Sequence, residues 1–357
     1  MFVNKIAYDP VGYVSYRDYM FMASKLNYRL QTMIRYERLE QAAMTEDTET
    51  AARLVAEAGW PNMAGMDVSQ IDTVLNNRRD SIFKDIEQVC PEEQVVQMMR
   101  MKYDYHNIKA LVKGAGAGVP ADEAYITAGR FTPENVKEDY LNNDYRDLTP
   151  LMAETIREAR EMMARTKNPT AVDLYIDRMY FRELFELASE LEPKVEPETP
   201  MMAPEPGEHY AVDLIRKMID RANLITCVRV VRLGRSQDYL KSVLIEDGNY
   251  PPDQLAAAAF GGDGLAGMFK DTYLYDAAQI GQDALKGGPI TPFEKACAEA
   301  WLKYLANLRM MYFDARAVIW YLTVVDANIL NVRMLLTGLL SGISAEKLKE
   351  RLRETYV

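Results

Sequence analysis

The chain has 357 residues, a formal net charge of −11 and a mean hydropathy of −0.25. Hydrophobic residues make up 48% and charged residues 27%, which is typical of a soluble globular protein and argues against a disordered chain. The acidic balance argues against a nucleic-acid partner, because neutralising phosphates requires clustered Lys and Arg on a basic domain. A single hydrophobic core seldom grows beyond about 250–300 residues, so we expect two or three lobes.

The sequence predicts neither a transmembrane helix nor a signal peptide. The longest apolar stretch, Ala317 to Val325, is shorter than the roughly 20 residues that cross a bilayer, and Asp326 closes it. The N-terminal residues Met1 to Pro10 contain no apolar core of signal-peptide length. We therefore expect a cytosolic protein.

In chain order, helix signals dominate. Ser15 and Asp18 can cap a helix that runs towards Ala43 with apolar residues at helical spacing. Further starts are indicated where a capping side chain precedes a proline. These starts are Thr149-Pro150, Asn168-Pro169 and Thr291-Pro292.

Glycines indicate where helices could end, because glycine enters the left-handed conformation at low cost. The predicted ends are Gly59, Gly114, Gly234 and Gly338. No run alternates apolar and polar residues as a strand would, so the predicted fold class is all-α. The segment from Glu192 to Glu208 holds five Pro and five Glu, which predicts an extended, mobile connector.

Few residues could carry chemistry. Gly262-Asp-Gly264-Leu-Ala-Gly267 spells a dinucleotide pattern, but a helix-forming alanine run precedes it where a strand would be required. There is no nucleoside-triphosphate loop, and the two histidines, His106 and His209, lie far apart. Cys90, Cys227 and Cys297 lack metal spacing and are predicted to be small core residues. No catalytic residue, cofactor, metal or small-molecule site is predicted.

Three segments repeat one pattern: an Asn in an amphipathic run, then Leu, Ile or Val, with a Lys or Arg within six residues. The segments are Asp104 to Lys113, Asp220 to Arg229 and Asp326 to Leu336. Downstream of each, a glycine precedes a helix start; these glycines are Gly129, Gly248 and Gly342. Two linked markers in one order indicate three copies of a unit of about 119 residues, a third of the 357. The predicted lobes are residues 1–122, 123–240 and 241–357.

The repeated Asn residues, Asn107, Asn223 and Asn331, allow two interpretations. An Asn inside a helix is mildly unfavourable, so its recurrence suggests either a buried hydrogen bond between helices or a shared contact surface. Basic residues on the repeat helices, which form local basic stripes on an acidic protein, are either solvated faces or an interface for an acidic partner. The basic candidates for partner contact are Lys109, Lys113, Arg229, Arg232 and Arg333.

The ordered set of these motifs resembles a known family. Tyr103 to Lys113, Asp220 to Thr226 and Asn331 to Gly338, with the run from Leu174 to Phe181 and the terminus Leu352 to Val357, are similar to the C subunit of V-type and archaeal-type rotary ATPases. The resemblance covers nearly the full length. The Pro/Glu-rich segment departs from the family pattern, and Asp326 and Thr337 match it loosely.

The resemblance implies a non-catalytic funnel of three similar helical lobes in a pseudo-threefold arrangement. It further implies that this funnel sits on the membrane rotor ring of proteolipid subunits and that its socket receives the central-stalk subunits. Such a coupler would lie at the cytoplasmic face of the membrane, peripheral to it through the ring, and would bind neither ion nor nucleotide. Two alternatives stay open: a free-standing helical scaffold for acidic cytosolic proteins, and an enzyme that uses the glycine-rich loop near Gly264.

Overall fold

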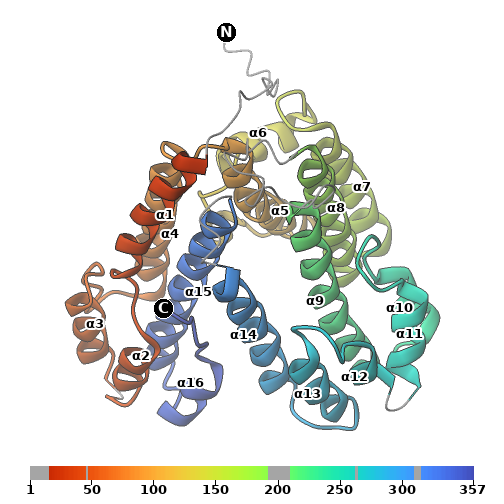
Figure 1. The fold of residues 1–357 in the computed structure, drawn as a ribbon. Coiled ribbons are helices and arrows are strands. Elements are labelled where there is room, and N and C mark those ends of the chain that lie inside the picture. The colour runs from red at the N-terminus through yellow and green to blue at the C-terminus, as the bar shows by residue number, and fades with distance from the viewer. Residues whose placement is uncertain (1–15, 46, 192–209, 262–263, 309–314) are drawn as a thin grey trace. The chain divides into compact units, whose positions relative to one another are not determined.

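The computed structural model describes residues 16–45, 47–191, 210–261, 264–308 and 315–357. Every regular element in these ranges is a helix, and none of these residues lies in a strand (Figure 1). The prediction of an all-α protein is confirmed. The Pro/Glu-rich segment 192–208 lies outside the described ranges, so its predicted character stays a prediction.

The chain divides into two compact units. The first comprises Met1–Asp18 with Phe83–Ile215, and the second comprises Tyr19–Ile82 with Arg216–Val357. Three helices contain a boundary of this division: α1 (Tyr16–Leu30), α4 (Val68–Glu87) and α9 (Tyr210–Arg232). The division into three lobes of similar structure stays a prediction.

The first unit is built around one long helix, α5 (Glu93–Ala117). It packs against α6 (Pro133–Asn142), α7 (Pro150–Thr166) and α8 (Pro169–Glu190), and α7 also packs against α8. A short 3₁₀ helix, η1, spans Asp122–Ala124.

Helices α7 and α8 begin where the sequence predicts. The Thr149 hydroxyl accepts the N–H of Met152, the Asn168 side chain accepts the N–H of Ala171, and a proline follows each cap.

The second unit gathers helices from both ends of the chain. The helices that lie wholly inside it are α2 (Tyr36–Ala43), α3 (Thr48–Glu57), α10 (Gln237–Val243), α11 (Pro252–Phe260), α12 (Gly264–Met268), α13 (Tyr275–Leu285), α14 (Ile290–Leu308), α15 (Arg316–Leu340) and α16 (Ala345–Arg351). The N-terminal helices α2 and α3 pack on α15, which also contacts α14 and α16.

Helix α15 is the central apolar element of this unit. Within the described residues it is the one helix whose length and composition would suit a membrane span. Of its apolar 18-residue stretch, 67% is buried inside the protein. The core helix of a soluble protein passes the same test, and one such helix is weak support for a span. Asp326, which closes the apolar run in the sequence, lies inside this helix, and its carboxylate pairs with the side chain of Arg79 at 3.1 Å.

Two helix boundaries differ from their predictions. The predicted helix towards Ala43 is broken between α1 and α2, because the Asn328 side chain binds both backbone groups of Ile34, which then cannot serve a helix. Ser15, its predicted cap, lies outside the described residues. Helix α14 begins at Ile290, so Thr291 lies inside its first turn.

Two of the four glycines predicted to end helices have that role. Gly59 and Gly234 follow α3 and α9 with positive φ, whereas Gly114 and Gly338 lie inside α5 and α15. A Cβ on Gly338 would overlap Leu348 of α16, so this glycine allows close helix packing instead of ending the helix. Gly118, with φ of 70°, ends α5.

Candidate functional site

The repeated asparagine of the first unit binds the backbone of a following loop. The Asn107 amide donates to the carbonyl oxygen of Ile126 at 2.8 Å, and its Oδ1 accepts the Ile126 N–H at 2.9 Å. Both groups of one loop residue are thereby satisfied by one side chain that is only 1% exposed. We call this paired interaction an asparagine clamp.

The second unit holds the other two repeats of this clamp. Asn223 binds the N–H and the carbonyl of Ile245, both at 2.8 Å. Asn331 binds the same two groups of Arg353, at 3.0 and 2.8 Å. The clamped residue lies 22 positions after the asparagine in both cases, and 19 after it in the first unit.

A fourth clamp was not expected from the sequence. Asn328, three residues before Asn331, binds the N–H and carbonyl of Ile34 at 3.0 and 2.9 Å. Asn223, Asn328 and Asn331 are all 0% exposed. The buried hydrogen-bond interpretation of the repeated asparagines is the one that the geometry shows. A partner contact through these side chains stays a prediction, and it would require the clamps to open.

An aspartate three residues before the asparagine holds the next part of the loop. Asp104 accepts the N–H of Arg130 at 2.8 Å, and Asp220 accepts the N–H of Asn249 at 2.8 Å. Burial raises the pKa of both carboxyl groups, to about 6 for Asp104, although hydrogen-bond donors around each act in the opposite direction.

These aspartates explain two of the repeated glycines. Gly129 and Gly248 precede the bound N–H groups, and a Cβ on either would overlap the aspartate Oδ1, at 2.7 Å in the case of Gly248. The third marker is not equivalent, because Gly342 ends α15 with φ of 69° and nothing lies near its missing Cβ.

The basic residues predicted to contact a partner bind other groups of the same chain. Lys109 and Lys113 of α5 pair with Asp177 and Asp173 of α8 at 2.5 and 3.1 Å. The other three act within the second unit, where Arg229 pairs with Glu294 at 2.7 Å and Arg333 pairs with Asp72 through two hydrogen bonds. Arg232 donates to the carbonyls of Ala284 and Gly288 and so satisfies the C-terminal end of α13. A partner contact by these five residues stays a prediction.

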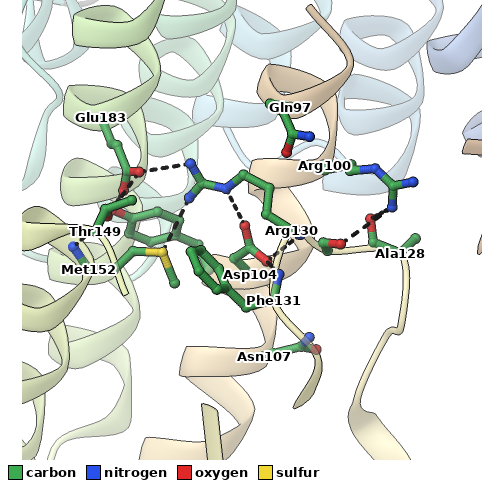
Figure 2. A network of polar contacts seen from close by, with 12 residues as sticks. Gln97, Arg100, Asp104, Asn107, Ala128, Arg130, Phe131, Thr149, Met152 and Glu183 are labelled. Carbon is green, nitrogen blue, oxygen red and sulfur yellow. Dashed lines mark hydrogen bonds and ion pairs between the residues drawn. The ribbon is translucent and has the colours of Figure 1, made fainter. Parts of the chain in front are cut away.

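A buried charge network extends from Asp104 (Figure 2). Arg130 donates its Nε to Asp104 at 2.6 Å and another guanidinium nitrogen to Glu183 of α8 at 2.9 Å. Thr149 and Tyr105 donate their hydroxyls to Glu183 at 3.1 and 2.5 Å. A buried ion pair is tolerated when hydrogen bonds satisfy its remaining groups, as they do here. The network joins α5, α8 and the loop between η1 and α6.

Two of the three cysteines are buried, and His106 contacts the backbone. Cys227 and Cys297 are 0% exposed, as predicted for core residues, while Cys90 is only partly buried. Burial raises the pKa of Cys90 to about 11 and those of the other two thiols to about 12. His106 is exposed, as predicted, and its Nε2 lies 2.9 Å from the carbonyl oxygen of Ala124.

The described residues contain no candidate metal site. No cluster of three or more His, Cys, Asp or Glu side chains that could hold a metal ion occurs in that part of the chain. The glycine-rich pattern lies partly outside it, since residues 262 and 263 are not described, and Gly264 begins α12.

The described part of the chain is all-helical, and in each of the three repeats an asparagine on a helix binds the backbone of a non-helical residue further along the chain. The chain belongs to the ATP synthase (C/AC39) subunit family, whose profile matches residues 24–351. The resemblance to the C subunit of V-type and archaeal-type rotary ATPases is thereby confirmed. Subunits of this class are non-catalytic and belong to a membrane-associated complex.

Relatives of this family are similar in sequence to most of the chain. The C subunit of the V-type sodium ATPase of Enterococcus hirae is 22% identical over 79% of this chain and 81% of its own length. The C subunit of the A-type ATP synthase of Pyrococcus horikoshii is 20% identical over 97% of this chain and 91% of its own length. The C subunit of the V-type ATP synthase of Thermus thermophilus is 19% identical over 70% of this chain and 78% of its own length.

Proposed function

We propose that this chain joins the membrane rotor ring to the central stalk of a V/A-type rotary ATPase, so that ion translocation is coupled to ATP synthesis or hydrolysis. The observation that carries the proposal is the family match across residues 24–351. The relatives are named as subunits of a sodium ATPase and of ATP synthases, which are rotary machines of this class. The protein would work at the cytoplasmic face of the membrane, peripheral to it through the ring.

Local stiffness supports this role. A part that transmits torque must not let its helices slide along their loops. Each asparagine clamp satisfies both polar groups of a loop residue, and leaving such buried groups unpaired would cost about 1–3 kcal/mol apiece. The recurrence of the clamp at Asn107, Asn223 and Asn331 also supports a unit repeated three times, although Ile126 and Ile245 lie beyond the predicted lobe boundaries at residues 122 and 240.

The test is reconstitution of the complex with and without the full-length chain. We expect the chain to co-purify with both ring and stalk subunits, and its omission to abolish ATP-driven ion transport while soluble ATP hydrolysis persists. A complex that lacks the chain and still couples hydrolysis to transport at the normal rate would overturn the proposal.

The free-standing scaffold for acidic proteins has less support. It requires available basic faces, whereas the five basic residues proposed to form them already bind groups of the same chain. If the purified chain alone bound acidic proteins tightly and ignored the ring and stalk subunits, the scaffold would become the better proposal.

A further inference from the structure

A groove of about 530 Å³ opens beside the buried charge network of the first unit. It lies between the start of α7 and the last turns of α8, which pack against each other. Arg130, Thr149 and Glu183 of the network line it, as do the apolar side chains of Leu148, Leu151 and Leu187.

The inner part of this groove is preorganised. The Arg130 and Glu183 side chains are only 6% and 9% exposed and are held by each other. Thr149 donates to Glu183 and also caps α7, so it is fixed from two sides. Since these groups have little freedom left, a guest would lose little free energy in ordering them.

The outer part is acidic and incompletely neutralised. Each lining arginine already has a carboxylate partner: Arg130 has Asp104 and Glu183, Arg146 has Asp144, and Arg182 has Glu186. In contrast, three exposed lining carboxylates form no ion pair with any described residue. These are Asp147, Glu154 and Glu190.

The end of α8 adds to this negative potential. A helix carries a partial negative charge at its C-terminus, where basic side chains are favourable. The last turn of α8 holds no basic residue, and Glu186 and Glu190 lie close to that end. Acidic residues there repel the helix end, and a cation bound nearby would relieve that repulsion.

From this geometry we propose that the groove is a docking site for a lysine- or arginine-bearing segment of a partner protein that also carries an apolar side chain. The cationic groups would pair with Asp147, Glu154 and Glu190, and the apolar side chain would contact Leu151 and Leu187. Electrostatic complementarity of this kind steers association and selects the partner. The proposal concerns a surface other than the repeat-helix faces and does not rest on the coupling role.

The experiment measures fluorescence anisotropy of the full-length protein with a labelled peptide of lysine and leucine in a two-to-one ratio. The triple variant D147N/E154Q/E190Q is expected to bind it at least ten-fold more weakly than the wild type. The matched control E161Q/E346Q/E350Q removes the same charge from exposed positions outside the groove and is expected to bind within two-fold of the wild type. Equal weakening in both triple variants would overturn the proposal.

Two further measurements separate a protein segment from a simple polycation. An all-lysine peptide of the same length and spermine are both expected to bind at least five-fold more weakly than the lysine–leucine peptide. If either binds equally well, the apolar contact plays no part and the proposed partner is wrong. Peptide addition should also slow hydrogen exchange at residues 148–154 and 183–190, and protection confined to other segments would overturn the location.

Discussion

Asn223 binds Ile245 through both backbone groups of that residue, with donor–acceptor distances of 2.8 Å in each direction. Replacing Asn223 by Leu would leave a buried N–H and a buried carbonyl without partners. We expect the free energy of unfolding to fall by about 2–6 kcal/mol, since each of the two lost partners costs about 1–3 kcal/mol. Urea denaturation measures the change.

An exposed asparagine supplies the control for this clamp. Asn27 lies on the solvent side of α1, and Asn27→Leu is expected to change the free energy of unfolding by no more than about 0.5 kcal/mol. Equal effects at Asn27 and Asn223 would show that the clamp contributes nothing specific.

Gly248 should not tolerate a side chain. A Cβ there would lie 2.7 Å from Asp220 Oδ1, so Gly248→Ala is expected to destabilise the protein by about 1–3 kcal/mol through overpacking. Gly267 lies in α12 with nothing within 4 Å of a Cβ, and Gly267→Ala is expected to be neutral or slightly stabilising. Thermal unfolding of the two variants, measured side by side, is the test. A loss of stability confined to Gly248→Ala would show that the close approach of Asp220, and not the helix start that follows, requires the repeated glycine.

A charge swap distinguishes the two possible uses of Lys113. Lys113→Asp breaks the pair with Asp173, whereas the double variant K113D/D173K restores a pair in reverse orientation. If Lys113 serves only the contact between α5 and α8, the double variant should regain wild-type assembly with ring and stalk subunits. If Lys113 contacts a partner, assembly should stay impaired in both variants. Co-purification yield is the measurement, and melting temperature reports on the internal pair.

Asp104 should make stability depend on pH. Burial raises its pKa to about 6 in the folded protein, against an ordinary value of 3.8. The folded state therefore retains a proton that the unfolded state releases, and the resulting stability is present below about pH 4 and lost as the pH rises through 6. Relative to Asp104→Asn, the wild type should gain about 1.4 kcal/mol between pH 7 and pH 5. A gain in the opposite direction would mean that Arg130 outweighs burial.

The thiols should be unreactive in the folded protein. Burial raises the pKa values of Cys90, Cys227 and Cys297 to about 11–12, so little thiolate exists at pH 8. We expect slow reaction with Ellman's reagent until the protein is unfolded, followed by release of three equivalents. Rapid labelling of one thiol in the native protein would identify a reactive cysteine and contradict this expectation.

The clamping asparagines could be found in the sequence, but their partners could not. Asn107 and Asn223 stand out because an Asn recurs in amphipathic runs of similar pattern. Ile126 and Ile245 contribute only backbone groups, which every residue type has, so the sequence holds no signal of their role. Asn328 did not stand out, although it lies three residues before Asn331, as Asp104 lies before Asn107.

The internal use of the basic residues was equally hidden. Arg333 and Asp72 lie 261 positions apart, and only the fold of the second unit brings them together. The same holds for Lys109 and Asp177, which meet because α5 packs on α8. A basic stripe on one helix therefore does not reveal from sequence whether solvent, a partner or another helix of the same chain neutralises it.

The clamp between Asn328 and Ile34 joins residues 294 positions apart. During synthesis, Ile34 cannot make this contact until α15, which carries Asn328, has left the ribosome. Chains emerge at about 5–20 residues per second, so tens of seconds pass in which the early helices of the second unit lack their final neighbour. Nascent chains halted before Asn328 should consequently depend on chaperones for solubility, whereas chains released after it should not.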